Sequence, residues 1–338
     1  MTSTIHTLTK TLLMAATLSL VAACDAEPEA ADIGPGDVSL RPLSGIQLNT
    51  SFIGGFEFSE LDTNFGVAHN DSVLLGVSVI YKRDPIPLDA VWVEKGMIVG
   101  RKGTMVFKGH DFLNSRWSLK LDYDHDGSMD SSIETTILSV VDDWTGVGDP
   151  YIRYNFAYDW KTAGGVIKKY IEPSEKPTPT CEVDVDTGSL EAVAIGDLSV
   201  DRKSGDMSIR KNTIQIACFS SATGKTATWN YLYHLYDVKT FETMVRMIRA
   251  DYCGDGYSWT EPGQKLQLED VYGVNGFVDP SGKDEAFWVV GGAAACLNLP
   301  RHPGVNVADV VAYCGIPECK GDEPTGYYGD SFHTKNMP

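Results

Sequence analysis

The chain has 338 residues and carries 46 acidic against 28 basic side chains, which gives a net charge of −18. Nucleic-acid binding needs a basic face for the phosphates, and the sequence has no lysine and arginine cluster, so we expect no nucleic-acid partner. The length is sufficient for one large domain or two ordinary ones.

The N-terminus has the pattern of a signal peptide that ends at Cys24. A short apolar run, Leu12–Leu20, follows Lys10 and is far below the roughly 20 residues that a membrane helix needs. Residues Val21–Cys24 resemble the lipobox of bacterial lipoproteins, which implies removal of residues 1–23 and attachment of lipid to Cys24. We therefore expect a protein of the cell envelope that reaches the membrane through its lipid and faces the periplasm or the cell surface. The alternative is a secreted protein cut nearby.

Residues 24–43 are rich in alanine, proline and acidic side chains and poor in large apolar ones, which predicts a flexible acidic tether. Residues 44–171 contain short β-branched and aromatic runs separated by turn residues, which predicts a β-rich N-terminal domain built as a sandwich or a barrel. The expected strands are Val73–Tyr81, Val91–Val93, Met97–Val99, Thr104–Phe107, Trp117–Leu121, Thr135–Val141, Tyr151–Tyr158 and Val166–Ile171.

Within this region, the aspartates of residues 122–130 alternate in a pattern similar to a calcium-binding loop. They occupy the first, third, fifth and ninth positions, with a glycine at the sixth, and are Asp122, Asp124, Asp126 and Asp130. The twelfth position is Ile133, and the acid comes one residue late, at Glu134. Two interpretations stay open, a calcium-binding turn between strands and a solvated Asp-Gly hairpin. Calcium is the one cofactor that the sequence suggests.

Residues 172–180 contain three prolines, which predicts a linker or an exposed loop. Residues 305–338 are expected to form a C-terminal extension with a short helix, Val307–Tyr313, and a loose polar tail from Gly321. Between these segments the strand-like runs are Leu190–Ile195, Met207–Ile209, Thr213–Phe219 and Thr228–Leu235. The fold class is therefore mainly β, with one or two short helices.

Apolar side chains recur at helical spacing from Phe241 to Tyr252, which predicts a helix. We expect Glu242 and Arg246 to form an i, i+4 pair on its outer face, and Gly254 to end it.

The sequence contains seven cysteines, of which the lipobox uses Cys24. An even number remains in an exported chain, which predicts three disulfides and leaves 15 connectivities open. A metal site is the alternative, but no Cys-x-x-Cys pair supports it and the histidines are scattered singly. All six cysteines follow residue 180, so we expect the C-terminal half to be the disulfide-stabilised one: Cys181, Cys218, Cys253, Cys296, Cys314 and Cys319.

The end of the predicted helix reads Ala250, Asp251, Tyr252 and Cys253, followed by Gly-Asp-Gly. It resembles the ADYC domain, a family named for this tetrapeptide and found in lipoproteins and secreted proteins of myxobacteria and related bacteria. The resemblance extends over residues 181–304, an ADYC-like domain, and implies no activity, because the family has none assigned. The family pattern has a second cysteine where this chain has Gly224–Thr226, so the resemblance does not supply the disulfide pairing.

Two interpretations of the motif stay open. Asp251 would lie in the last turn of its helix, where the dipole disfavours an anion, so its carboxylate could instead accept amides of the following turn in a structural corner. Alternatively, Asp251 and Asp255 could form an acid/base or cation-binding pair, which predicts that both open into a cleft. The common serine-hydrolase and zinc-protease patterns are absent. We therefore expect a non-catalytic binding or structural module with a protein or carbohydrate partner, and an exported enzyme as the alternative.

Overall fold

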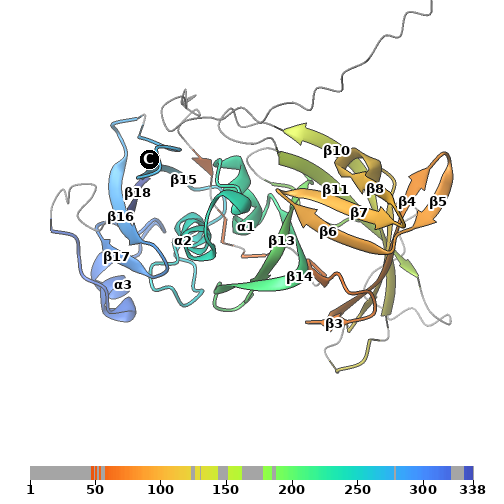
Figure 1. Cartoon of the computed structure of the whole chain (residues 1–338). Helices are drawn as coiled ribbons and strands as arrows, with labels where there is room; N and C mark the ends of the chain where they lie inside the picture. The colour runs from red at the N-terminus through yellow and green to blue at the C-terminus, as the bar shows by residue number, and fades with distance from the viewer. Residues whose placement is uncertain are drawn as a thin grey trace, which may run out of the picture. The chain divides into compact units, whose positions relative to one another are not determined.

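The fold is mainly β, as predicted, with antiparallel strands in three sheets and three α-helices among the described residues (Figure 1). The signal peptide, the tether with Cys24 and the expected strand Val166–Ile171 lie outside this described part. The computed structural model describes residues 47–48, 50–51, 53–54, 58–122, 126–129, 131–143, 151–161, 178–184, 188–277, 279–320 and 331–337.

The largest sheet has ten strands. They are β2 (Glu60–Asp62), β3 (Ala68–His69), β4 (Ser72–Tyr81), β5 (Asp84–Pro87), β9 (Arg116–Leu121), β10 (Ser131–Asp143), β11 (Tyr151–Lys161), β12 (Thr178–Pro179), β13 (Ala192–Val200) and β14 (Met207–Cys218). Eight of them follow the order β2-β14-β13-β11-β10-β9-β4-β3, while β5 pairs with β4 and β12 with β11. The strands expected in this sheet are confirmed, and the two runs between residues 207 and 219 form the single strand β14.

The first and last strands of this order meet through buried side chains, so the sheet is curled. Glu60 lies on β2 and His69 on β3, and His69 Nε2 is 2.5 Å from Glu60 Oε1. The Ser72 hydroxyl on β4 donates to the backbone oxygen of Glu60 at 3.2 Å. All three residues are buried. Since buried polar groups need partners, these contacts satisfy the groups while they hold the sheet ends together.

A three-stranded sheet packs against the large one, and it contains β6 (Ala90–Glu94), β7 (Met97–Lys102) and β8 (Met105–Lys108), followed by the 3-10 helix η1 (Gly109–Phe112). Its Ile98 and Phe107 pack with Trp117 and Phe156 of the large sheet. We call this cluster the first core. The alternation of exposed and buried side chains along β9 shows the two-residue period of a strand with one face in the core.

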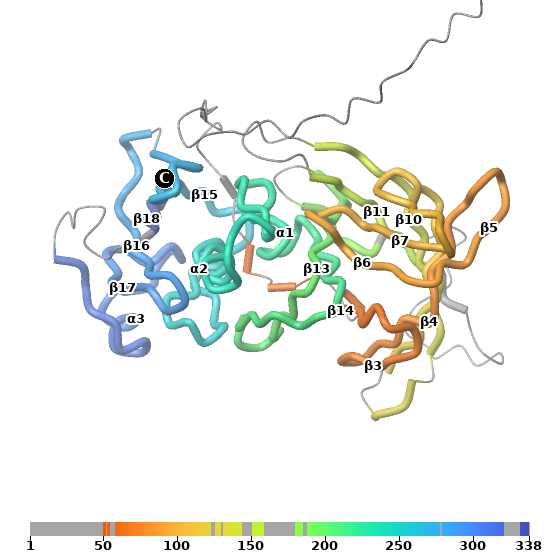
Figure 2. The backbone as a smooth tube through the Cα atoms, viewed as in Figure 1, coloured from red at the N-terminus to blue at the C-terminus, as the bar shows by residue number. Residues whose placement is uncertain are grey.

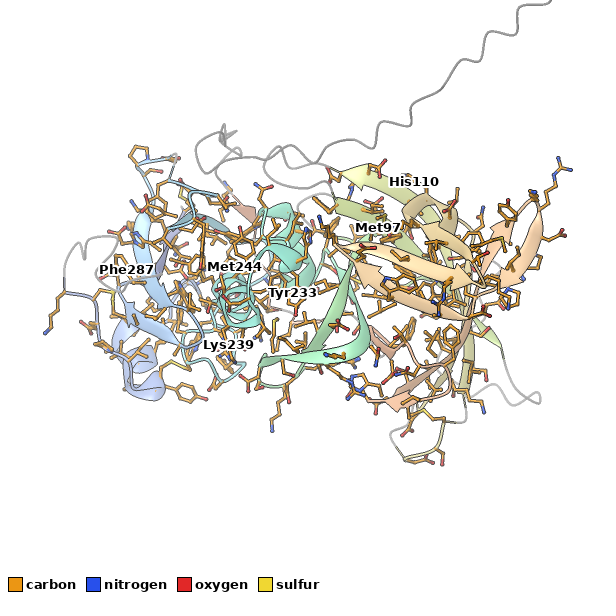
Figure 3. All side chains as sticks on the ribbon, in the orientation of Figure 1. Met97, His110, Tyr233, Lys239, Met244 and Phe287 are labelled. Carbon is orange, nitrogen blue, oxygen red and sulfur yellow. A yellow bond between two sulfur atoms is a disulfide. The ribbon has the colours of Figure 1, made fainter. Side chains whose placement is uncertain are left out.

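Two helices follow β14, α1 (Ala222–Thr228) and α2 (Val238–Arg249), with the 3-10 helix η2 (Tyr233–Leu235) between them. The helix α2 contacts both β14 and the C-terminal sheet (Figures 1 and 3). Its Phe241, Met244 and Ile248 pack with Trp288 and Leu297 in a cluster that we call the second core. The side chain of Asp237 begins α2 by accepting two backbone amides of the first turn.

The predicted pair of Glu242 and Arg246 forms, at 2.9 Å, but the prediction of an outer face was wrong. Both side chains are at most 4% exposed. The turn before β14 covers them, because the Met207 amide donates to Glu242 Oε2 and Asp206 pairs with Arg246. Periodicity identifies the apolar stripe of a helix and cannot show that a second segment covers the polar stripe.

The C-terminal sheet has five strands in the order β1 (Gln47–Leu48), β15 (Lys265–Asp270), β18 (Ser331–Asn336), β16 (Lys283–Val289) and β17 (Ala294–Leu297). The prediction of a loose tail was wrong for β18, which pairs with β15 and β16 (Figure 2). Phe332 and Thr334 are fully buried there. A six-residue run with one large apolar side chain shows too weak an alternation to be recognised in the sequence.

The prediction of a strand over Thr228–Leu235 was also wrong. The backbone of Asn230 has a φ of 66°, which interrupts an extended chain. The preceding Trp229 amide donates to carbonyls of α1 instead of a neighbouring strand. Trp229 and Tyr231 are buried in the second core, and the partly buried Tyr233 packs against it. Tertiary packing and not strand pairing therefore accounts for the aromatic residues of this run.

The six cysteines form three disulfides, as predicted, and these pair Cys181 with Cys218, Cys253 with Cys314 and Cys296 with Cys319. The first of them lies in the first core, and the other two join the C-terminal segments that surround α3 (Val307–Cys314). The division into domains at residues 172–180 stays a prediction. The large sheet contains strands from both sides of it. No helix of the described part is long and apolar enough to span a membrane.

Candidate functional site

The helix α2 is capped at its C-terminus by Ala250, the first residue of the ADYC tetrapeptide. Ala250 has φ 51° and ψ 42°, the left-handed conformation of a helix C-cap. Its amide donates to the Met247 oxygen, and the Asp251 amide donates to the Arg246 oxygen at 2.9 Å. This is the hydrogen-bond pattern of a Schellman motif. The expectation that Gly254 ends the helix was therefore wrong, and Asp251 lies beyond the last turn.

Asp251 is fully buried and binds the backbone that follows it. Its Oδ1 accepts from the Asp255 amide at 3.2 Å, and its Oδ2 accepts from the Gly256 amide at 3.1 Å. Arg246 and Arg249 approach the same Oδ2, at 3.6 and 3.5 Å. Burial raises the pKa of Asp251 from 3.8 to about 6, against the opposing effect of the two arginines and the amides. The carboxylate thus accepts the amides that the structural interpretation predicts.

Tyr252 connects the motif to two distant segments of the chain. Its hydroxyl donates to Glu285 Oε1 at 2.7 Å and accepts from the Arg301 amide at 2.9 Å. The guanidinium of Arg301 also binds Glu285 and donates to the Met247 and Ile248 oxygens, both at 2.9 Å. Arg301 therefore satisfies two carbonyls at the end of α2 and places a positive charge at the negative end of the helix.

Cys253 forms its disulfide with Cys314, the last residue of α3. The helix α3 begins after Asn306, whose side chain accepts the Ala308 amide, and is capped by Gly315 in the left-handed conformation. Each residue of the tetrapeptide thus has a structural role. Ala250 caps the helix and Asp251 anchors the next loop. Tyr252 donates a hydrogen bond to a buried ion pair, and Cys253 forms a cross-link.

The loop after the motif is held against the body of the protein. Arg249 donates to the Gly256 oxygen at 2.6 Å, and the Trp259 amide donates to the Ala250 oxygen at 3.2 Å. Gly256 has a φ of 88°, and a Cβ there would lie 2.0 Å from the Lys203 oxygen. Only glycine fits this conformation and this close approach.

Three aromatic rings gather on the surface at this loop. Tyr257 and Trp259 follow the motif, and Tyr313 on α3 contacts both, with ring centroids 4.8 to 6.4 Å apart. The exposed fractions of Tyr257 and Tyr313 are 55% and 62%. Asp255 lies beside them and accepts the Tyr313 hydroxyl at 3.3 Å. The negative charge of Asp255, together with this hydrogen bond, raises the pKa of Tyr313. We call Asp255, Tyr257, Trp259 and Tyr313 the aromatic cluster.

Sequence reasoning missed this cluster, because Tyr313 is separated from the other rings by more than fifty residues. Its only sequence signal is the neighbouring cysteine, Cys314, and the pairing with Cys253 was left open. The alternative of an acid/base pair is not supported by the geometry. Asp255 is exposed, but Asp251 is fully buried under the loop, so the two do not open into one cleft.

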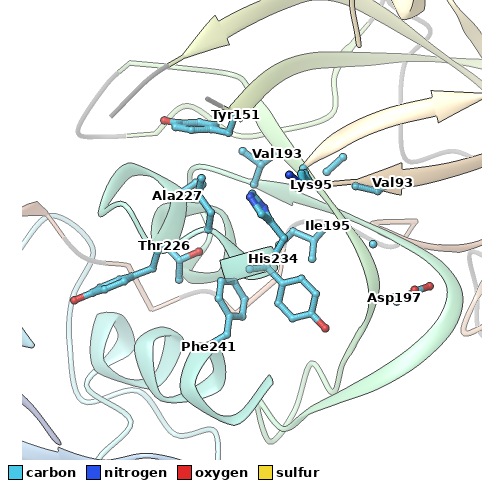
Figure 4. A pocket seen from close by; sticks show the side chains of 16 residues that line it. Val93, Lys95, Tyr151, Val193, Ile195, Asp197, Thr226, Ala227, His234 and Phe241 are labelled. Carbon is cyan, nitrogen blue, oxygen red and sulfur yellow. The ribbon is translucent and has the colours of Figure 1, made fainter. Parts of the chain in front are cut away.

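A cavity of about 120 Å³ lies between β13, the turn that joins β6 to β7, and the segment from α1 to α2 (Figure 4). Apolar residues such as Ile195 and Phe241 form much of its wall. The imidazole of His234 points toward the turn that carries Lys95. None of the site residues singled out from the sequence lines this cavity.

Of the four candidate calcium ligands, Asp124 and Asp130 lie outside the described residues. Asp122 is buried, and its two oxygens accept the Asp126 and Gly127 amides at 3.0 and 2.8 Å. The described residues contain no group of three or more metal-ligating side chains. Calcium binding at this turn stays a prediction.

Three disulfides in a mainly β fold define a disulfide-bonded protein of the extracytoplasmic type. The model of the ADYC domain matches residues 109–303, more than half of the chain, and the protein belongs to this family. The match begins in η1, well before residue 181, and ends before Tyr313 and Cys314. Comparisons with curated proteins and with solved structures gave no match.

Proposed function

We propose that the protein is a non-catalytic binding module of the cell envelope, tethered to a membrane through lipid on Cys24. In this proposal the ADYC motif is the support of a binding surface, and the aromatic cluster is that surface. Extracytoplasmic disulfides and the lipobox-like Val21–Cys24 support the location.

One observation carries the binding role: two motif residues fix the two segments that bear the exposed rings. The Asp251 carboxylate holds the amides of Asp255 and Gly256, next to Tyr257. The Cys253 disulfide holds α3 at the residue next to Tyr313. Adjacent exposed aromatic side chains are typical of interaction sites, and holding them rigid lowers the entropy lost on binding.

The anchor is tested by expressing the full chain in a bacterium that is fed an alkyne analogue of palmitate. We expect the label on the wild-type protein and its recovery in the membrane fraction, with both lost in Cys24→Ser. Cys296→Ser is the matched control, because it removes a cysteine without touching the lipobox. An unlabelled wild-type protein in the soluble fraction would contradict the proposal.

Calcium stabilisation at residues 122–130 is a separate part of the proposal. Its test is calorimetric titration of calcium into the chelator-treated protein and into Asp124→Ala. Saturable binding that the variant loses supports a metal-stabilised turn. Absence of heat in both proteins reduces the segment to a hairpin held by Asp122.

A further inference from the structure

We infer that the aromatic cluster receives a cationic side chain, arginine or lysine, from a basic partner protein. This inference rests on the proposed binding role and names the chemistry of the partner. The first support is the angle between the rings. Their planes are inclined by 66° between Tyr257 and Trp259, by 70° between Trp259 and Tyr313 and by 54° between Tyr257 and Tyr313.

Rings inclined in this way do not form the flat platform on which a sugar ring stacks. They present π faces and edges in several directions around a compact surface, and the faces carry the negative part of the ring quadrupole. A guanidinium or ammonium group is attracted to such faces within about 6 Å of a ring centroid. The geometry therefore favours a compact cation over an extended neutral ligand.

The second support is the carboxylate beside the rings. Asp255 Oδ1 accepts the Tyr257 amide at 2.9 Å and Oδ2 accepts the Tyr313 hydroxyl at 3.3 Å. A carboxylate has about four acceptor positions, so an exposed one with two neutral donors can still accept from a guanidinium. The nearby cations below the loop, Arg246 and Arg249, are already bound to carboxylates or backbone oxygens.

The third support is a contrast with other rings of the same chain. Lys82 lies 5.1 Å from the centroid of Tyr81, and Lys335 lies 4.2 Å from that of Phe277. These are the cation–π contacts found in the described part of the chain, and neither involves the aromatic cluster. There the rings have an aspartate as their charged neighbour, which leaves the cation to be supplied by another molecule.

We assign the cationic group to a partner protein and not to a free small cation. The exposed fractions of 55% and 62% show an open surface that could enclose little of a free ammonium ion. The chain also carries a net charge of −18, and such a charge steers a basic macromolecule toward the surface and contributes to affinity beyond the cluster.

The test is calorimetric titration of a hexa-arginine peptide into the full chain in detergent micelles, at two ionic strengths. We expect saturable binding that weakens with salt. Tyr313→Ala should weaken it about fivefold, the upper end of one partly exposed cation–π contact. Asp255→Asn should weaken it at least threefold, since one charge is removed without a change of shape, and Tyr313→Phe should retain the ring contribution.

Two residues in similar settings provide matched controls. Tyr81→Ala removes an exposed tyrosine that its own lysine already covers. Asp279→Asn removes a partly exposed carboxylate that likewise accepts an amide two residues on. Both should change the affinity less than twofold. Equal losses in Asp255→Asn and Asp279→Asn would overturn the inference, because they show attraction to net charge alone.

Binding of a neutral oligosaccharide, chitohexaose, in competition with the peptide would also overturn it. If Tyr313→Ala fails to fold, the loss of peptide affinity in Asp255→Asn, compared with that in Asp279→Asn, tests the inference by itself. Lipid labelling on Cys24 is independent of these titrations. A failed titration with a lipidated protein therefore rejects the cationic partner and leaves the tethered location standing.

Discussion

The two cores of this protein are stabilised in different ways. The first core consists of aliphatic and aromatic side chains that alternate along strands, with one disulfide, Cys181–Cys218. The second core is built around α2 and also buries three acidic and three basic side chains, each at most 4% exposed: Glu242, Arg246, Arg249, Asp251, Glu285 and Arg301. The first depends mainly on apolar burial, with the Glu60 and His69 pair buried where the sheet ends meet. The second buries a larger set of charges around α2 and requires them to stay matched.

This difference shows where the ADYC motif matters. Removing a charge from water is costly, so a buried charge is stable only when its partners and hydrogen bonds are in place. Asp251 and Tyr252 take part in that matched set. Substitutions in the second core should therefore lower the free energy of unfolding strongly when they leave one charge without a partner. They should lower it little when all the charges keep their partners.

The largest effect is expected for Arg301→Met, which removes a fully buried cation and leaves Glu285 charged beside Tyr252. Loss of one partner of a buried pair costs about 3–5 kcal/mol. The control Arg210→Met removes a partly exposed arginine from its pair with Asp62 in the large sheet. Asp62 is buried but keeps two hydrogen bonds from Asn64, so the cost should be about 1 kcal/mol or less. Urea unfolding of the three proteins measures both values. Similar losses in the two variants would mean that the two regions do not differ.

Removing the disulfide at the motif should have the next largest effect. The double variant Cys253→Ser, Cys314→Ser opens a link across 61 residues, for which we expect a loss of about 2–4 kcal/mol. We also expect faster hydrogen exchange confined to α3 and the loop after the motif. If the strands β9–β11 exchange faster by the same factor, the separation between the two cores is wrong.

Asp251 should make stability depend on pH in an unusual direction. Its pKa is raised from 3.8 to about 6 by burial, so the folded protein binds the extra proton between these values. Protonation of Asp251 therefore stabilises the folded protein, fully below about pH 4 and no longer above about pH 6. Over this range the free energy of unfolding should fall by about 1–3 kcal/mol. Asp251→Asn should flatten this slope, whereas Asp255→Asn should keep it. An unchanged slope in Asp251→Asn contradicts this assignment.

Ala250→Gly is expected to have the smallest effect, a change within about 1 kcal/mol. The variant relieves a left-handed alanine but loses a buried methyl group and makes the unfolded chain more flexible, and these contributions oppose each other. Ala227→Gly, inside α1, is the control and should destabilise by about 1 kcal/mol or more. A large loss in Ala250→Gly would mean that the methyl group has a packing role beyond the helix cap.

Elements with regular alternation could be predicted from the sequence, such as β9 and β11, and so could the apolar stripe of α2. The partners of the motif could not, because Glu285 and Arg301 are ordinary charged residues in sequence and become a buried pair only when β16 and the segment before α3 meet. The aromatic cluster could not be predicted from the sequence for the same reason. Its three rings come together only through the fold and one disulfide pairing.

The central claim is that the ADYC motif acts by holding the loop that displays the aromatic cluster. Hydrogen exchange of the Asp255 and Gly256 amides, both hydrogen-bonded to Asp251, tests it most directly. We predict slow exchange in the wild-type protein and fast exchange in Asp251→Asn, while β9–β11 stay protected in both. Fast exchange of these two amides in the wild type, or no change in the variant, would contradict the claim.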